Sequence, residues 1–186
     1  MPINGVGWEI EFTRTAVQTQ PTTGRLRTIG TYQLFHDGLA QPGTDMSGMF
    51  AERPGPGDNS KVGKKNGLRI AAGRYPLATQ AGTKYVTIGY ANSNMINVLP
   101  RPGVELLNTD KRSEILIHPG IGFLSSIGCI NLCASLPNGA EGITYTSSRR
   151  RVISMIDDMK SYIGAAFPNA NGRSVSNAHA ILDGEP

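Results

Sequence analysis

The sequence predicts a mostly β domain, a β-rich α+β fold with one main packed helix near its C-terminus. Its 186 residues include 23 glycines and 12 prolines, only 17% are charged, and apolar–polar alternation recurs while helical periodicity occurs once. Frequent glycine and proline favour a fold of short strands joined by turns and disfavour a helical bundle. A chain of this length suits one domain with a sizeable core. We expect a single domain over residues 1–167 and a polar C-terminal tail over residues 168–186.

Two strands are expected in the N-terminal part of the chain. Residues 6–15 and 25–36 alternate apolar and polar side chains, which is typical of half-buried strands, and the turn residues 21–24 separate them. Residues 40–67 are rich in glycine, proline and polar residues. They predict a long loop, interrupted by a small apolar island at 49–51, and loops of this length often carry function.

The rest of the chain predicts more strands and one helix. Four further strands are expected, at residues 68–80, 83–90, 97–100 and 114–118. Apolar residues at helical spacing predict a helix over 148–164, with Ser147 or Ser148 as its N-cap. Within the tail, residues 176–182 form one weakly helical patch.

Two basic clusters have no evident chemistry in the sequence. Three arginines open the predicted helix and are interpreted as a solvated face: Arg149, Arg150 and Arg151. Three lysines fall in the long loop and are placed, by position alone, on a lid over the cleft: Lys61, Lys64 and Lys65.

Charge and patterning argue against two classes of partner. The net charge of +4 is mildly basic, but no phosphate-cradling glycine motif precedes a helix and no basic stripe is interleaved with aromatic residues. Nucleic-acid binding therefore has no positive support. The longest uncharged stretch, residues 115–140, contains two prolines and four glycines, so we expect no membrane insertion. The first residues, MPINGVGWEIEF, lack a basic region and an apolar run, so we expect synthesis in the bacterial cytoplasm without a Sec signal.

The segment that suggests chemistry is residues 114–132. His118 ends a predicted strand, a glycine-rich turn follows, and Ser126, Gly128 and Cys129 come next. A cysteine nucleophile needs a base within reach because the thiolate is the attacking species. Eleven turn-rich residues can fold back and bring His118 to Cys129. Gly128 would let backbone N–H groups approach an oxyanion, and Ser126 would hold the loop or the imidazole.

This segment resembles the signature of the YkuD-type L,D-transpeptidase catalytic domain, in a compact variant with a short spacing from His to Ser-x-Gly-Cys. The matching residues are His118, Ser126, Gly128, Cys129, Ile130 and Asn131. Ile127 stands where the family usually has a second histidine, and Ile121 and Ser125 replace the Asn and Asp of the compact set. Upstream, residues 68–77 with Tyr75 resemble the family's I-P-x-G-x-Y strand.

The resemblance implies a β-sandwich or barrel that performs covalent cysteine catalysis on the stem tetrapeptides of peptidoglycan. Cys129 would attack the carbonyl between the L-centre of diaminopimelate and the terminal D-alanine. His118 would act as base and then as acid toward the leaving amine, and backbone N–H groups near Gly128 would hold the oxyanion. Transfer of the acyl group to an amine gives transpeptidation, and transfer to water gives carboxypeptidase activity.

The resemblance also implies substrate contacts and partners. Asn131, Tyr75 and Gly120 are expected to contact substrate, and no cofactor or metal ion is expected. A cell-wall enzyme without a Sec signal would reach the periplasm through a dedicated secretion machine of the type VI kind, as an antibacterial effector, or would come from a phage. An effector would normally travel with an immunity protein that fills the cleft.

Three alternatives stay open from the sequence. Cys129 and Cys133 with His118 could join a second histidine, His36 or His179, in a zinc site. Cys129 followed by His179 satisfies the residue order of papain-like enzymes. The third alternative is a catalytically silent wall-binding or phage structural domain. If there is no zinc site, Cys133 is expected to lie in the core and His36 at an exposed edge.

Overall fold

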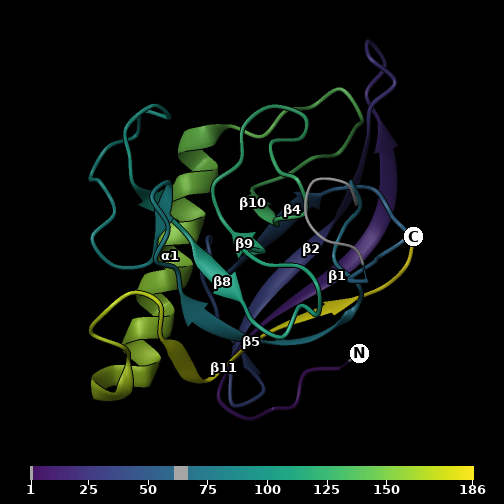
Figure 1. The fold of residues 1–186 in the computed structure, drawn as a ribbon. Helices are drawn as coiled ribbons and strands as arrows, with labels where there is room; N and C mark the ends of the chain where they lie inside the picture. The colour runs from purple at the N-terminus through teal and green to yellow at the C-terminus, as the bar shows by residue number, and fades with distance from the viewer. Residues whose placement is uncertain (1, 61–66) are drawn as a thin grey trace.

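The computed structural model describes residues 2–60 and 67–186, and its centre is one strongly curved sheet of nine strands (Figure 1). The strand order is β10-β4-β2-β1-β11-β5-β8-β9, with β3 added beside β2. The strands of this sheet are β1 (Trp8–Thr19), β2 (Leu26–His36), β3 (Leu39–Ala40), β4 (Ser47–Glu52), β5 (Gly73–Thr79), β8 (Val104–Leu106), β9 (Leu116–Ile117), β10 (Asn131–Cys133) and β11 (Ser174–Asp183). A second, two-stranded sheet pairs β6 (Tyr85–Val86) with β7 (Arg101–Pro102). The helices are α1 (Tyr145–Ile163) and a short 3₁₀ turn, η2 (Gly164–Ala166).

The two ends of this sheet meet and nearly close it into a barrel. Ile117 of β9 forms a parallel bridge with Ile130, the residue before β10. Two backbone hydrogen bonds join these ends, from the His118 N–H to the Ile130 carbonyl (3.1 Å) and from the Ile130 N–H to the Leu116 carbonyl (2.8 Å). The prediction of a mostly β, barrel-like domain with a single packed α-helix near the C-terminus is confirmed.

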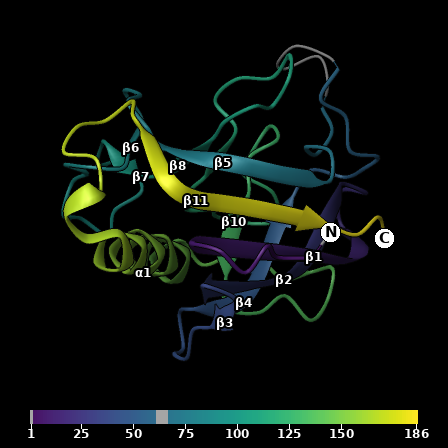
Figure 2. The ribbon, with the colours of Figure 1, turned by 90° about the horizontal axis from the view of Figure 1, so that it is seen from below.

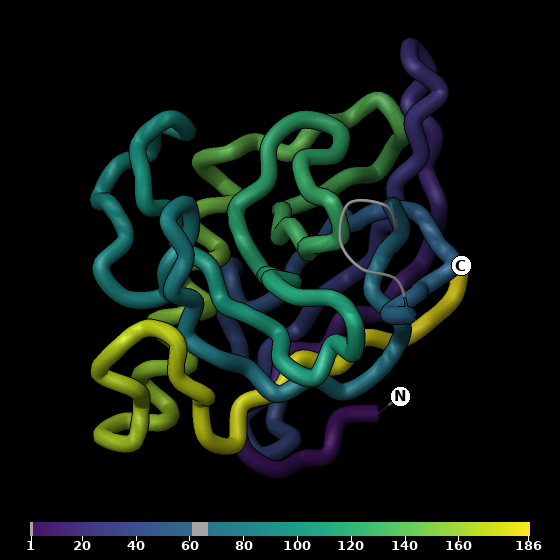
Figure 3. Tube along the Cα trace, viewed as in Figure 1, coloured from purple at the N-terminus to yellow at the C-terminus, as the bar shows by residue number. Residues whose placement is uncertain are grey.

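The long hairpin of β1 and β2 forms the back of the barrel, and its turn extends beyond the other strands (Figure 3). Viewed from below, β5, β11, β1, β2 and β4 follow one another across the sheet, and α1 lies at one end of them (Figure 2). Trp8, Ile10 and Phe12 alternate into the core, where the Phe12 ring meets Phe50 edge-on at 5.0 Å. The apolar side chains whose alternation predicted β1 are therefore the ones that fill the barrel.

Helix α1 packs an apolar face onto the barrel and is also held by polar contacts. Its buried residues include four that are fully inaccessible: Val152, Met155, Ile156 and Met159. Asp158 accepts hydrogen bonds from the Trp8 indole (2.8 Å) and pairs with His36 (2.9 Å). The expectation of an exposed, unpartnered His36 is therefore wrong, because this side chain joins β2 to the helix.

The helix begins earlier than predicted, and serine does not cap it. Its N-cap is Thr144, which makes no side-chain capping bond. The Ser148 hydroxyl donates instead to the Leu132 carbonyl and accepts the Gly120 N–H (2.9 Å). This serine is fully buried, and its two hydrogen bonds connect the helix to β10 and to the segment around His118.

The prediction that the three arginines at the start of the helix are solvated is wrong for two of them. Arg149 is buried and donates to the Ala91 carbonyl (2.7 Å), while Arg151 is buried and donates to the Tyr32 hydroxyl (2.8 Å). Of the three, only Arg150 is exposed, and it forms an ion pair with Asp45. Long side chains on α1 thus satisfy the carbonyls of the loops that surround the helix.

The prediction of a polar C-terminal tail with a weakly helical patch is wrong, because this segment contains a strand of the main sheet. Residues 174–183 form β11, which lies between β1 (parallel) and β5 (antiparallel) in the middle of the sheet. Ala178, Ala180 and Leu182 alternate into the core and are fully buried. Small side chains with helical propensity occupy a strand here because burial between two neighbours outweighs that propensity.

Other boundaries also differ from the prediction. The apolar island at 49–51 is part of β4, an inner strand between β2 and β10, so the expected loop 40–67 is interrupted by core structure. Residues 97–100 form turns, and the expected strand at 83–90 is reduced to β6. The lysines placed on a lid over the cleft lie outside the described residues. No helix in the described ranges combines the length and the apolar character needed to cross a bilayer.

A buried ion pair holds one end of the barrel. The Arg14 guanidinium on β1 donates to the Glu52 carboxylate at the end of β4 (2.6 Å) and to the Ile70 carbonyl (2.7 Å). Both charged side chains are fully buried. Because neither charge has access to water, each depends on the other for its stabilisation.

We predict that Glu52→Gln lowers the free energy of unfolding by about 3 kcal/mol, because it removes the buried counter-charge of Arg14 and leaves only the half-exposed Glu185 carboxylate at 3.7 Å. Urea unfolding followed by circular dichroism measures this change. The matched control is Arg150→Met, which breaks an exposed pair with Asp45 and should cost about 1 kcal/mol or less. Equal losses in the two variants would contradict the prediction.

Candidate active site

The closure of the barrel brings His118 and Cys129 to one pocket. His118 directly follows β9, Cys129 lies two residues before β10, and the bridge from Ile117 to Ile130 sets the two segments side by side. The pocket has a volume of about 330 Å³. It is lined by Gln80, Gly82, Thr83, Lys84, Tyr85, Glu114, Leu116, His118 and Cys129. The expectation that the turn-rich spacer folds back on itself agrees with this arrangement.

The His118 imidazole is held in one tautomer. Its Nδ1–H donates to the Pro119 carbonyl (2.8 Å), so Nε2 carries the lone pair. The Tyr85 ring packs against the imidazole with centroids 4.3 Å apart. Burial, with a smaller contribution from the positive charge of Arg101, lowers the pKa of His118 to about 4, although the hydrogen bond to Pro119 opposes this shift. At neutral pH the ring is therefore uncharged and can accept a proton.

The Cys129 thiol is held by backbone groups. Its sulfur accepts the Leu116 N–H (3.4 Å) and lies 3.5 Å from the Glu114 carbonyl, to which the S–H donates. Burial raises the pKa of Cys129 to about 11; the Leu116 hydrogen bond and the Arg112 charge oppose this rise, and the Glu114 charge adds to it. The resting pair is a neutral thiol and a neutral imidazole, so the proton must move when the sulfur attacks a substrate.

Ser126 and Gly128 shape the loop that carries the cysteine. The Ser126 hydroxyl donates to the Cys129 carbonyl (2.7 Å), and Arg53 donates to the Ser126 carbonyl (3.0 Å). Of the two roles expected for Ser126, its contacts fit bracing of the loop. Gly128 has a φ of 123°, and a Cβ there would lie 1.8 Å from an Arg112 nitrogen, so only glycine admits this guanidinium.

Backbone donors are available beside the sulfur. Within the described residues, neither the Gly128 N–H nor the Cys129 N–H donates to a protein acceptor. Unpaired N–H groups next to a nucleophile are the kind of donors that hold a developing oxyanion. The expected oxyanion position near Gly128 is compatible with this backbone.

The three residues expected to contact substrate, Asn131, Gly120 and Tyr75, do not line this pocket. The fully buried Asn131 amide donates to the His118 carbonyl (3.0 Å) and accepts the Ser125 hydroxyl (3.1 Å). A Cβ at Gly120 would lie 2.7 Å from the Asn131 Cβ, so glycine allows this close packing. The Tyr75 hydroxyl donates to the Ala71 carbonyl (2.7 Å), and its ring is part of the core. In the structure the polar groups of Asn131 and Tyr75 are bound within the protein, and direct contact of the three residues with substrate stays a prediction.

The papain-like and zinc alternatives gain no support. His179 lies on β11 opposite Pro76 and does not line the pocket of Cys129. No group of three or more His, Cys, Asp or Glu side chains in residues 2–60 and 67–186 is arranged to hold a metal ion.

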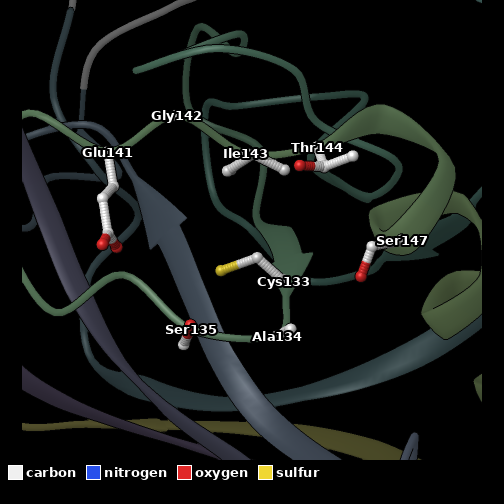
Figure 4. Close-up of a pocket in the computed structure, with 8 residues that line it drawn as sticks. All are labelled: Cys133, Ala134, Ser135, Glu141, Gly142, Ile143, Thr144 and Ser147. Atoms are coloured by element: carbon white, nitrogen blue, oxygen red, sulfur yellow. The ribbon is translucent and has the colours of Figure 1, made fainter.

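Cys133 belongs to the core, as expected. It packs with Ile29, Leu136 and Ile143, and burial raises the pKa of its thiol to about 12. Its sulfur borders a second pocket of about 280 Å³ beside the start of α1, between Glu141, Ser135 and Ile143 (Figure 4). This position is separate from the pocket that contains His118 and Cys129.

Four charged or amide side chains of the site were not predicted from the sequence. Gln80, Lys84 and Glu114 line the pocket, and Arg112 packs against Gly128. Glu114 opens the segment that delivers His118, so its position could have been suspected. Lys84 and Arg112 carry no sequence signal, because only the fold brings their segments to Cys129.

Comparison of the chain with protein-family models, with curated proteins and with solved structures finds no match in any of the three.

We predict that the Cys129 thiol reacts slowly with iodoacetamide at pH 7.5, about a hundredfold more slowly than an unperturbed thiol, because a pKa of about 11 leaves little thiolate. The rate should rise about tenfold per pH unit between pH 7 and 9.5. Mass spectrometry of a Cys133→Ala background follows Cys129 alone. Glu114→Gln should speed the reaction, because the carboxylate raises the thiol pKa. A fast reaction that is independent of pH would mean a preformed thiolate.

We also predict a stability change that depends on His118. The pKa of His118 is about 4 in the folded protein and about 6.5 when unfolded, so the unfolded chain binds more protons between these values. The contribution of His118 to the free energy of unfolding is fully present above pH 6.5. It decreases by up to about 3 kcal/mol as the pH falls toward 4. Urea unfolding at pH 7 and pH 4.5 measures the loss. His118→Asn, whose amide can still donate to Pro119, should lose less stability; parallel losses would contradict the assignment.

Proposed function

We propose that this protein is a cysteine-dependent peptidoglycan L,D-transpeptidase or L,D-carboxypeptidase that acts on stem tetrapeptides. The observation that carries the proposal is that Cys129 and His118 line one pocket, with the imidazole tautomer held so that Nε2 can accept a proton. Ser126, Gly128 and Asn131 match the transpeptidase signature, whereas Ile127 departs from it. Bracing of the cysteine loop by Ser126 and of the histidine backbone by Asn131 is consistent with a site held ready for covalent chemistry.

The proposed reaction has two acyl transfers. The Cys129 sulfur forms a bond to the carbonyl carbon of the L-centre as its proton passes to His118 Nε2. The tetrahedral oxyanion collapses, the C–N bond breaks, and the imidazolium gives its proton to the departing amine of D-alanine. The thioester is then attacked by an amine or by water, whose proton passes through His118 to the sulfur.

The backbone supplies the electrostatic part of this proposal. The free N–H groups of Gly128 and Cys129 would stabilise the oxyanion, and the Leu116 N–H and the Arg112 charge would stabilise a transient thiolate. The reaction would not need a resting ion pair, because the neutral His118 is the base and the neutral Cys129 is the proton donor.

Delivery and partners are part of the same proposal. A peptidoglycan enzyme of this kind would act in the periplasm, as an antibacterial effector carried by a secretion system or as a phage accessory. An immunity protein would then protect the producing cell by filling the pocket at Cys129.

A catalytically silent wall-binding domain is the second candidate. Two observations favour it: Ile127 occupies the place of the family's second histidine, and the pKa of Cys129 is raised to about 11. Such a domain would sediment with peptidoglycan sacculi without changing their muropeptides.

Tetrapeptide muropeptides, with and without D-methionine, test the proposal by mass spectrometry. Wild type should remove the terminal D-alanine or replace it, and Cys129→Ala should do neither, because the acyl-enzyme cannot form. His118→Asn should slow turnover by about 10²–10⁴-fold, as expected for loss of a general base. Thermal unfolding confirms that each variant is folded. Unchanged muropeptides with folded wild type, together with binding to sacculi, would favour the silent domain.

A further inference from the structure

The loop that leads to Cys129 is held by a row of arginines from distant parts of the chain. Four of its backbone carbonyls, between residues 123 and 127, each accept a hydrogen bond from a different guanidinium group. The pairs are Arg27 with Phe123 (3.0 Å), Arg25 with Leu124 (3.0 Å), Arg53 with Ser126 (3.0 Å) and Arg112 with Ile127 (3.4 Å). The loop has no regular secondary structure, so these side chains provide acceptor contacts that a helix or sheet would otherwise supply.

Arg112 is the member of this row that contacts the residues next to the nucleophile. Its side chain is buried and donates to two carbonyls, those of Asp58 (3.1 Å) and Ile127 (3.4 Å). Its own backbone is fixed by Thr109, because the Arg112 N–H donates to the Thr109 carbonyl (3.1 Å) and the Thr109 hydroxyl donates to the Arg112 carbonyl (2.5 Å). The guanidinium is therefore a fixed bridge between two loops.

The carbonyl that Arg112 binds belongs to the same peptide unit as the Gly128 N–H. This peptide bond is trans, so its C=O and its N–H point in opposite directions. A guanidinium bound to the Ile127 carbonyl therefore directs the Gly128 N–H away from itself. In residues 2–60 and 67–186, that N–H has no protein acceptor.

Glycine at position 128 is a condition for this contact. A Cβ there would lie 1.8 Å from one Arg112 nitrogen and 3.0 Å from the central guanidinium carbon. The φ of 123° is also one that residues with a Cβ seldom adopt. The glycine and the arginine therefore act together to set the orientation of one peptide unit.

The charge of Arg112 suits a site in which negative charge develops. Across the part of the chain that the structure describes, Arg112 forms no ion pair, and its hydrogen-bond acceptors are carbonyls. Burial lowers the pKa of Arg112, and Cys129 is the group that most opposes this shift. A thiolate at Cys129 and the guanidinium thus stabilise each other.

We propose that Arg112 is a positioning residue for the oxyanion site: it holds the 127–128 peptide so that the Gly128 N–H faces the carbonyl oxygen under attack. This inference rests on the proposed acyl transfer to Cys129. As the sulfur–carbon bond forms, the substrate oxygen becomes negative and accepts the Gly128 N–H. The hydrogen bond from Arg112 polarises the same peptide and makes its N–H a stronger donor.

Two reagents separate the oxyanion site from the reactivity of the sulfur. Iodoacetamide alkylates Cys129 without forming an oxyanion. With p-nitrophenyl acetate, the sulfur forms a bond to the acetyl carbon through a tetrahedral oxyanion, the C–O bond breaks, nitrophenolate leaves, and the thiol proton passes to His118. Both reactions depend on the amount of thiolate, so the ratio of acetylation to alkylation rates reports the oxyanion site. Mass spectrometry measures both rates in a Cys133→Ala background.

Arg112→Met should lower this ratio by about 10–100-fold, as expected for a misdirected oxyanion donor. The matched comparison is Arg53→Met, which removes the brace on the preceding peptide, whose N–H belongs to Ile127. It should change both rates in parallel and leave the ratio unchanged. An unchanged ratio in Arg112→Met, or an equal fall in Arg53→Met, would overturn the inference.

Arg112→Lys separates position from charge and decides the matter if Arg112→Met does not fold. A lysine keeps the positive charge, but its ammonium lacks the planar fork that spans the Asp58 and Ile127 carbonyls. The alkylation rate should stay near that of wild type while the ratio falls. A wild-type ratio in Arg112→Lys would show that charge alone is required and would overturn the positioning role. Thermal unfolding confirms that each variant is folded.

Neither reagent is a peptidoglycan fragment, so the test is independent of the proposed substrate. If wild type leaves muropeptides unchanged but the ratio falls in the Arg112 variants, the proposed function fails and the role of Arg112 stands. If muropeptides are turned over and the ratio does not fall, the proposed function stands and this inference is wrong. A wild type that is alkylated but never acetylated would also overturn it, because no working oxyanion site would be present.

Discussion

The meeting of β9 with the start of β10 is the contact on which the candidate site depends. Two hydrogen bonds and one bridge join the first and last strands of the sheet path, and they leave His118 and Cys129 at the seam. Neither residue is placed by a helix or by a long strand. Their separation is determined by the curvature of the whole sheet, which in turn depends on the core under α1 and on the buried pair of Arg14 and Glu52. The site is therefore as stable as the closure of the barrel.

The sequence was informative where a single segment carries its own pattern. Alternation in residues 6–15 and 25–36 was sufficient for β1 and β2, and helical spacing was sufficient for α1 to within three residues. It failed for β11 and β4, because their burial comes from neighbours far away in the chain. Ala178 and Ala180 carry no strand propensity of their own, and the apolar island at 49–51 is short and surrounded by turn residues. Such strands are recognised only when the adjacent strands are known.

The site shows the same division. His118, Gly128 and Cys129 were identifiable because nucleophile, base and glycine lie within one short segment. Residues that tune this pair come from elsewhere: Tyr85 packs on the imidazole and Arg112 faces Gly128. Asn131 was found by resemblance, but its full burial turns it toward the His118 backbone, a detail that no spacing could have revealed.

The position of β11 has a consequence for how the chain reaches its native state. This strand pairs with β1 in parallel, so residues near positions 8–13 must find partners near positions 178–183. Contacts between such distant residues have a high loop-closure cost and slow the search for the native topology. Until they form, β1 and β5 both present open backbone edges, which invite pairing with other chains. The nascent protein should therefore depend on chaperones for longer than a domain of this size built from local hairpins.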